Sequence, residues 1–188
     1  MRIIAGEARG RRLIAPHDRT IRPPLDKTRE SIFSRLEGTF EGRCVLDLFA
    51  GVGSLGLEAL SRGARRAVFV EKASSSLVLL EKNIQRLGFG PRSEVVEGDA
   101  LKLPDLRKLK EPSYSLVFLD PPFSFFKSEK AVEEIYERVR GILGSGALEA
   151  GANVLLRQPA KFKGACPIPI CEKRAYGESV LLRFLAKA

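Results

Sequence analysis

One stretch constrains the fold of this chain more than any other, the apolar run and glycine turn over residues 45–56 (VLDLFAGVGSLG). Its first part has the composition of a buried strand, and its second part continues into the apolar pattern of a helix. Gly51, Gly53 and Gly56 give the spacing G-x-G-x-x-G. In it the first glycine permits a tight turn, the second a close ligand approach, and the third close packing of helix on strand. A bare glycine triplet also marks ordinary strand-to-helix turns, so the motif alone leaves both interpretations open.

Two carboxylates give this turn a chemical preference. Asp47 precedes Gly51 near the end of the first strand, where we expect its carboxylate to face a ligand. Glu71 ends the next apolar run, about 20 residues after the first glycine, where an acidic residue binds ribose hydroxyls in nucleoside-binding α/β folds. A carboxylate at position 47 opposes a phosphate and suits a cation such as a sulfonium. The pattern resembles the cofactor signature of class I S-adenosylmethionine (SAM) methyltransferases.

Beyond residue 43 the sequence alternates between strand and helix patterns, which predicts a mostly parallel sheet covered on both faces. We expect strands at residues 44–47, 67–70, 94–96, 115–119 and 153–156, and helices at residues 55–61, 74–87, 100–108 and 128–143. Two last extended runs, residues 168–172 and 179–185, predict a closing antiparallel hairpin joined by residues 174–177. The expected fold is therefore α/β and Rossmann-like. Its seven-stranded, mostly parallel sheet with an antiparallel C-terminal hairpin has the shape of the class I methyltransferase fold.

The most specific motif follows the fourth expected strand and consists of Asp120, Pro121, Pro122 and Phe123. Two prolines restrict φ and remove two N–H donors, so the loop presents a carboxylate and carbonyl oxygens beside an aromatic ring. This arrangement fits a planar base with an exocyclic amine, because Phe123 can stack on the base while Asp120 and the Pro121 carbonyl accept the amine hydrogens. Asp120 can also take the leaving proton, directly or through water. The competing interpretation is a rigid strand-to-helix turn.

A third strand end adds Asp99 and Ala100, because ligands of such sheets bind at the carboxyl ends of the strands. Asp99 can accept a hydrogen bond from an adenine amine or N-cap the next expected helix, and the two roles are compatible. The predicted cofactor-binding residues are Asp47, Phe49, Ala50, Gly51, Gly53, Glu71, Asp99 and Ala100, and the predicted cofactor is SAM.

Positive charge is concentrated ahead of the sheet. The chain carries a net charge of +9, and residues 1–36 hold nine Lys or Arg and four Asp or Glu. Residues 2–4 and 12–15 predict a small β-hairpin, followed by a Pro-rich loop and a helix from residue 27 to about 36 with Asp26 as its N-cap. Guanidinium groups match phosphates, so residues 1–24 are expected to form a basic RNA-binding arm and residues 25–188 the methyltransferase domain. The predicted RNA-binding residues are Arg2, Arg9, Arg11, Arg12 and Arg22.

Composition limits the remaining possibilities. Three cysteines and one histidine offer neither a zinc site nor a disulfide framework, so we expect no metal. No apolar run approaches about 18 residues, which predicts no transmembrane helix, and the first residues lack a signal-peptide pattern. We expect a cytoplasmic monomer.

Together these motifs resemble those of the RsmD family. The motif at residues 120–123 is similar to the [DNS]-P-P-[FYW] motif of amino-methyltransferases that act on nucleic acids. The family pattern extends to residues 2–6, 9–11, 22–23, 26, 28–33, 47–51 and 56–64, and to Tyr176-Gly177. The resemblance weakens over residues 101–113 and 155–171. It implies methylation of N2 of one guanine in small-subunit (16S) ribosomal RNA, with that RNA or the assembling small subunit as partner.

Three other functions stay open on the sequence. An adenine-N6 methyltransferase on DNA or RNA often carries N-P-P-[YF], so Asp120 favours the guanine enzyme without excluding the adenine one. A nicotinamide dehydrogenase would explain the glycines and Glu71 but not the motif at residues 120–123. A non-catalytic RNA-binding module that retains the fold is the third.

Overall fold

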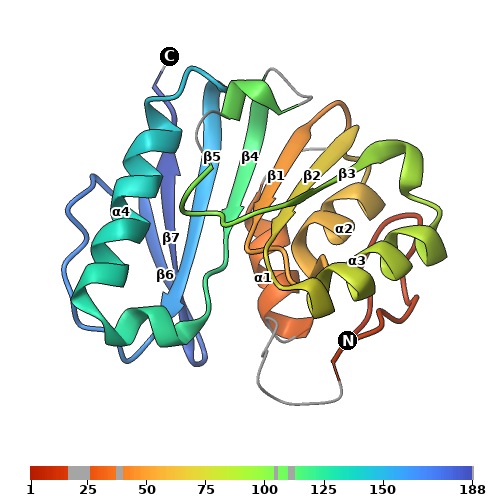
Figure 1. Cartoon of the computed structure of the whole chain (residues 1–188), viewed down its shortest axis with the longest axis horizontal. Coiled ribbons are helices and arrows are strands. Elements are labelled where there is room, and N and C mark those ends of the chain that lie inside the picture. Colours follow the sequence, from red (N-terminus) through yellow and green to blue (C-terminus); the bar gives the residue numbers. More distant parts are fainter. Residues whose placement is uncertain (17–25, 37–39, 104–105, 110–112, 188) are drawn as a thin grey trace.

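The structure of the protein is a computed structural model that describes residues 1–16, 26–36, 40–103, 106–109 and 113–187 (Figure 1). Its helices are α1 (Asp26–Arg35), α2 (Ser54–Ser61), α3 (Ser74–Leu87) and α4 (Glu129–Leu143). Short 3₁₀ helices span Gly90–Arg92, Leu106–Lys108 and Phe123–Lys127. The strands are β1 (Cys44–Leu48), β2 (Arg66–Glu71), β3 (Ser93–Glu97), β4 (Tyr114–Leu119), β5 (Leu148–Pro159), β6 (Glu172–Tyr176) and β7 (Ser179–Leu185).

All seven strands form one sheet in the order β3-β2-β1-β4-β5-β7-β6. The strands β1 to β5 are parallel, and β7 pairs antiparallel with both β5 and β6. The chain winds away from β1 through β2 and β3 on one side and through β4 and β5 on the other. The strand order therefore reverses between β1 and β4, the place at which open α/β sheets bind their ligands. The expected mixed seven-stranded sheet is confirmed.

Helices cover both faces of this sheet (Figure 1). The helices α1, α2 and α3 share one hydrophobic cluster, and α4 packs on the opposite face in a second cluster. Ile135, Val139 and Ile142 of α4 are buried, at the spacing that puts apolar side chains on one side of a helix. Ser128 caps this helix by accepting a hydrogen bond from the N–H of Ala131. No helix in the described ranges has the length and apolar character needed to cross a membrane.

The N-terminal segment, residues 1–16, packs on the face that carries α2 and α3. Its buried side chains belong to the same hydrophobic cluster as those of α1 to α3. Glu58 of α2, which is fully buried, accepts hydrogen bonds from the N–H groups of Ile4 and Ala5 at 2.8 and 3.0 Å. Gly6 has φ +81°, and a Cβ added to it would lie 1.7 Å from the carbonyl oxygen of Ser61. Side-chain and backbone contacts therefore hold the segment against the sheet and the helices that cover this face. The expected boundary at residues 24–25 lies outside the described residues.

The predicted N-terminal hairpin is not present as a pair of strands. Arg2 and Arg12 form one isolated antiparallel bridge, flanked by backbone hydrogen bonds from Ile3 to Arg11 at 3.0 Å and from Leu13 to Met1 at 3.2 Å. The pairing goes no further because the next N–H groups, those of Ile4 and Ala5, donate to the carboxylate of Glu58. The predicted helix at residues 100–108 is also wrong. In the described part of that range the structure has a turn after residue 100 and a 3₁₀ helix at Leu106–Lys108. Pro104 in the sequence supplies no N–H and disfavours helical backbone before it.

The C-terminal hairpin begins later than predicted. The strand β6 starts at Glu172 and includes residues 174–176, which the sequence pattern assigned to the turn. The turn itself is Gly177 and Glu178, with Gly177 at φ 55°, and two-residue hairpin turns favour such a left-handed glycine.

Candidate active site

A pocket of about 440 Å³ opens at the switch point, where the carboxyl ends of β1, β2 and β4 meet. This volume lies within the range of about 300–1,000 Å³ that is usual for small-molecule sites. Most of the predicted site residues line it: Phe49, Ala50, Gly51, Glu71, Ala100, Asp120, Pro121, Pro122 and Phe123. Three predicted cofactor residues do not line it: Asp47, Gly53 and Asp99.

Glu71, at the end of β2, is bound directly to the glycine turn. The N–H of Gly51 donates to Oε2 of Glu71 at 2.7 Å, and the N–H groups of Lys72 and Ala73 donate to Oε1 at 2.9 and 2.8 Å. An ionised carboxylate offers about four acceptor positions. Three backbone partners therefore hold the carboxylate at the pocket wall and leave acceptor capacity for the hydroxyl groups of a ligand.

Phe49 connects the loop after β1 with the loop after β4. It has φ 62°, a left-handed conformation that is uncommon for a residue other than glycine. Its ring meets the ring of Phe125 edge-on, with centroids 5.9 Å apart. Strained backbone of this kind persists where the surrounding structure imposes it, commonly at ligand sites.

Asp47, Gly53 and Gly56 stabilise the glycine turn from the protein interior. Asp47 is buried, and its Oδ2 accepts a hydrogen bond from the N–H of Gly56 at 2.8 Å; burial raises the pKa of Asp47 well above its ordinary value. A Cβ on Gly56 would lie 2.3 Å from the Phe69 ring, so the predicted close packing of helix on strand is confirmed. Beside Gly53 the space is filled by Leu80, 2.5 Å from an added Cβ, rather than open to a ligand. Asp47 and Gly53 shape the turn without facing the pocket.

Asp99 caps a turn beside the pocket, between Gly98 and Ala100, which do line it. Its Oδ1 accepts a hydrogen bond from the N–H of Leu101 at 3.1 Å, and its Oδ2 lies 3.3 Å from Nζ of Lys72. Burial raises the pKa of Asp99, but these partners outweigh it and the net change is a lowering. Asp99 therefore has the predicted capping role, but it caps a turn instead of the helix expected at residues 100–108.

Arg157, at the end of β5, was not among the site residues predicted from the sequence. Its Nε donates to Oδ1 of Asp120 at 2.5 Å, and its Nη1 donates to Oγ of Ser179 at 3.3 Å. Its Cζ lies 4.7 Å from the centroid of the Phe123 ring. One guanidinium therefore holds both the carboxylate and the aromatic ring of the loop after β4. The available signal was position, because Arg157 is the first charged residue after the expected strand at residues 153–156.

The ion pair determines what Asp120 can do. The side chains of Asp120 and Arg157 are only 12% and 11% exposed. Burial raises the pKa of Asp120, and the charge and hydrogen bond of Arg157 oppose that rise without cancelling it, so the net change is a rise. In its ionised form, paired with the guanidinium, the carboxylate only accepts hydrogen bonds. Together with the two prolines, which have no N–H groups, the carboxylate lines this side of the pocket with hydrogen-bond acceptors, and such a surface suits an amine.

The predicted RNA-binding arginines have different surroundings. Arg2, Arg9 and Arg12 are exposed. Arg11 is exposed too, but it donates hydrogen bonds to the carbonyl oxygens of Arg86 and Leu87, at the C-terminal end of α3, where a positive charge complements the helix dipole. Arg22 lies outside the described residues.

Related proteins share this architecture. The family model described as conserved hypothetical protein 95 matches residues 1–184. The ribosomal RNA small subunit methyltransferase D of Haemophilus influenzae is 39% identical over 141 residues, 73% of this chain and 71% of that protein. A hypothetical protein of Thermus thermophilus, of solved structure, is 32% identical with a TM-score of 0.77, over 100% of this chain and 99% of that one. An RNA methyltransferase of Salinibacter ruber in complex with S-adenosyl-L-homocysteine shares the fold at 16% identity and a TM-score of 0.62, over 88% and 94% of the two chains.

Proposed function

Because the chain belongs to the RsmD-like family described as conserved hypothetical protein 95, we propose that it transfers a methyl group from SAM to N2 of a guanine in small-subunit (16S) ribosomal RNA. The observation that carries this proposal is the ion pair between Asp120 and Arg157, which lies beside two donor-free prolines and Phe123 at the switch-point pocket. The name of the Haemophilus influenzae relative supports the choice of substrate.

The residues present fit SAM. The pocket is large enough for a nucleoside. Beside the backbone of Ala50 and Gly51, the carboxylate of Glu71 can still accept a hydrogen bond from a ribose hydroxyl. Gly98 and Ala100 form the wall next to Glu71, where Gly98 donates its N–H to the Glu71 carbonyl at 2.9 Å. When bound, SAM supplies a methyl group that its positively charged sulfur has already activated.

The chain's own residues then have to prepare the amine. Its lone pair is delocalised into the base, so acceptors on its hydrogens favour a pyramidal nitrogen with the lone pair free. Asp120 and the Pro121 carbonyl are such acceptors, and Phe123, held by Arg157, provides a stacking surface for the base. Asp120 also receives the proton that the amine loses, directly or through water. Positioning of the nitrogen in line with the methyl group supplies much of the remaining acceleration.

The pairing of Asp120 with the guanidinium of Arg157 supports guanine over adenine. The edge of guanine that carries N2 presents two neighbouring donors, N1–H and the amine. Adenine presents its amine beside an acceptor, N1. A carboxylate that only accepts hydrogen bonds matches the two donors of guanine and leaves the N1 of adenine unpaired. An unpaired polar group in a buried site costs about 1–3 kcal/mol.

Mapping of methyl groups tests the function directly. Small-subunit rRNA from a strain that lacks the gene is incubated with the protein and labelled SAM, digested, and analysed by mass spectrometry. We expect one N2-methylguanine. N6-methyladenine would establish the adenine alternative, and RNA binding without any transfer would establish a non-catalytic module.

Loss of the Glu71 carboxylate is expected to weaken the binding of SAM. In Glu71→Ala the ribose loses an ionised acceptor and the N–H of Gly51 loses its partner, so affinity should fall by about 1.5–3 kcal/mol. Titration calorimetry measures this, with Glu97→Ala as the matched control because Glu97 is exposed at the end of the neighbouring strand and does not line the pocket. Unchanged affinity in a folded Glu71→Ala protein would exclude Glu71 from the cofactor site.

We propose that the exposed arginines ahead of the sheet, Arg2, Arg9 and Arg12, contact phosphates of the rRNA, together with Arg22. Replacing Arg9 and Arg12 by alanine should reduce the salt dependence of RNA binding by about 0.7–0.9 log units for each lost phosphate contact and leave thermal stability unchanged. Arg11→Ala should show the reverse, a lower melting temperature from the exposed end of α3 with the RNA salt slope retained. Equal salt slopes for the wild type and the double variant would show that Arg9 and Arg12 do not contact RNA.

A further inference from the structure

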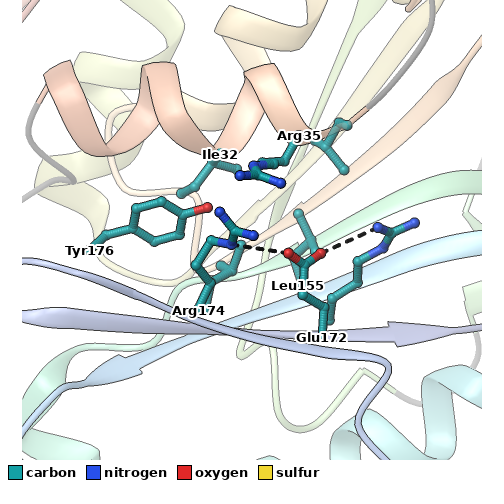
Figure 2. A pocket seen from close by; sticks show the side chains of 9 residues that line it. Ile32, Arg35, Leu155, Glu172, Arg174 and Tyr176 are labelled. Carbon is teal, nitrogen blue, oxygen red and sulfur yellow. Dashed lines mark hydrogen bonds and ion pairs between the residues drawn. The ribbon is translucent and has the colours of Figure 1, made fainter.

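A second, small pocket lies between α1 and the strands at the C-terminal edge of the sheet (Figure 2). The helix α1 contributes Ile32 and Arg35, and β6 contributes Arg174 and Tyr176. Its volume is about 20 Å³, and a water molecule needs roughly 10–15 Å³ on this scale. The enclosed space therefore holds about one water molecule and excludes a nucleobase, and a larger group such as a phosphate would lie at its open side, where the side chain of Arg35 is exposed.

Positive charge exceeds negative charge around this pocket. Its lining includes three arginines, and Glu172 is the one acidic residue in that lining. Glu172 accepts hydrogen bonds from Nε of Arg174 at 3.1 Å and from Nη1 of Arg183 at 3.5 Å, so a single carboxylate is shared between two cations. Arg35 is exposed and has no ion-pair partner among the residues that the structure describes. The local charge is thus favourable for an anion.

Two of these cations face each other. In Figure 2 the guanidinium groups of Arg35 and Arg174 point toward one another from α1 and β6, with the hydroxyl group of Tyr176 beside them. Burial raises the pKa of Tyr176, while Arg174 and Arg35 lower it and Glu172 adds to the rise, so the net change is a rise to which both cations are opposed. Two like charges repel, and an anion between them would replace the repulsion by charge-assisted hydrogen bonds. Guanidinium forks match the oxygens of a phosphate, and the Tyr176 hydroxyl adds a further donor.

Arg174 of this pocket and Arg157 of the active-site ion pair lie on the same face of the sheet. In the sheet register Arg174 is opposite Leu181 of β7, and Leu181 is opposite Arg157 of β5. Residues directly opposite each other point to the same face, and neighbouring strands are about 4.8 Å apart. The backbone of Arg174 therefore lies about 10 Å from that of Arg157, within reach of nucleotides next to the one whose amine meets Asp120.

We propose that Arg35, Arg174 and Tyr176 bind a backbone phosphate of the RNA strand that carries the target guanine. This inference rests on the proposed function, because it assigns a role in substrate binding to residues outside the methyl-transfer pocket. It also gives a role to Tyr176-Gly177, since the turn at Gly177 reverses the chain directly after the tyrosine. When a base is flipped out of its stack, the protein has to hold the neighbouring nucleotides. A phosphate-binding site beside the active-site pocket would hold them independently of their sequence.

The test compares two double variants in rRNA methylation. Arg35→Gln with Arg174→Gln removes two charges from the pocket. Lys130→Gln with Lys163→Gln removes two exposed charges from α4 and the segment packed beside it, on the opposite face. For the pocket variant we expect the KM for small-subunit rRNA to rise roughly tenfold or more, with kcat and the Kd for SAM unchanged. The dependence of log KM on log salt should flatten by about 0.7 for each lost contact to single-stranded RNA. Tyr176→Phe, which removes only the hydroxyl, should raise KM by a smaller factor.

Each outcome decides one of the two proposals. A wild-type protein that methylates no rRNA overturns the proposed function. A wild-type protein that methylates rRNA, with pocket and control variants alike in KM and salt slope, overturns the phosphate site and leaves the proposed function standing. If the pocket variants are impaired on assembled small subunits but not on protein-free rRNA, the partner is a ribosomal protein, and the RNA assignment is wrong. The single variant Arg35→Gln, at an exposed helix position, repeats the test if the double variant does not fold.

Discussion

Replacing Asp120 by alanine is expected to slow methyl transfer by roughly 100- to 10,000-fold, the range for loss of a positioned acid–base group, while the affinity for SAM stays within a few-fold. The carboxylate is the acceptor that faces the amine, and its removal leaves the buried guanidinium of Arg157 without its ionic partner. Single-turnover transfer at saturating SAM measures the chemical step apart from RNA release. The Glu97→Ala protein, altered at an exposed strand end, is expected to match the wild type.

The isosteric change Asp120→Asn separates the two roles of this residue. An amide keeps one acceptor oxygen in place but carries no charge and receives no proton. We expect Asp120→Asn to retain more activity than Asp120→Ala, because it still orients the amine, and to lose selectivity for guanine. If Asp120→Ala transferred methyl groups at the wild-type rate, the carboxylate would have neither role.

Loss of Arg157 is expected to slow transfer by about 100-fold at neutral pH, a magnitude usual for removing one preorganised electrostatic partner. The loss should shrink as the pH rises. Burial already raises the pKa of Asp120, and Arg157 opposes that rise. Without Arg157 the pKa moves further up, so more of the carboxyl group is protonated at pH 7. The reaction needs the ionised form, which means that activity falls as the pH drops through this pKa and returns above it.

Rates measured from about pH 5 to pH 9 for the wild type, Arg157→Ala and Arg157→Lys test this sign. Lysine keeps a positive charge near Asp120 but loses the planar fork that also covers Phe123. We therefore expect its acid limb to lie between those of the other two proteins. Parallel pH profiles for wild type and Arg157→Ala, displaced only in height, would limit Arg157 to holding the Phe123 ring.

The order and type of the central elements could be predicted from the sequence because local signals agreed with the fold. Apolar runs, glycine turns and the stripe of α3 each marked an element that the structure contains at nearly the same residues, except that β5 extends over Leu148–Pro159 where the apolar run predicted residues 153–156. The motif at residues 120–123 was found because its chemistry is carried by neighbours in the chain. Arg157 was missed because Asp120 and Phe123 are far from it in sequence, and only the sheet brings β4 and β5 together.

Other errors have the same origin. Asp47 was expected to face the ligand, but the neighbouring Leu46 and Leu48 occupy the α4 side of the sheet, so alternation turns Asp47 toward α2 and the N–H of Gly56. The contacts of Arg11 with the end of α3 were likewise not foreseen, because the two segments are far apart in sequence. Local pattern cannot report which partner from a distant segment satisfies a polar group.

The close contact between Gly6 and Ser61 fixes the position of the N-terminal segment relative to the active-site pocket. Arginines on a loose tether would accept phosphates at many distances and add only an effective concentration set by the tether length. Here the backbone of residues 1–16 is held by Glu58 and shares its core with the sheet that carries the pocket, so the spacing between the arginines and Asp120 is set before any RNA arrives. An RNA in which the distance between the flipped-out base and the phosphates does not match this spacing must bend, or it loses contacts with the arginines. The protein can thus discriminate among RNAs by their shape. The entropy cost of ordering residues 1–16 is met when the protein folds and not when it binds RNA.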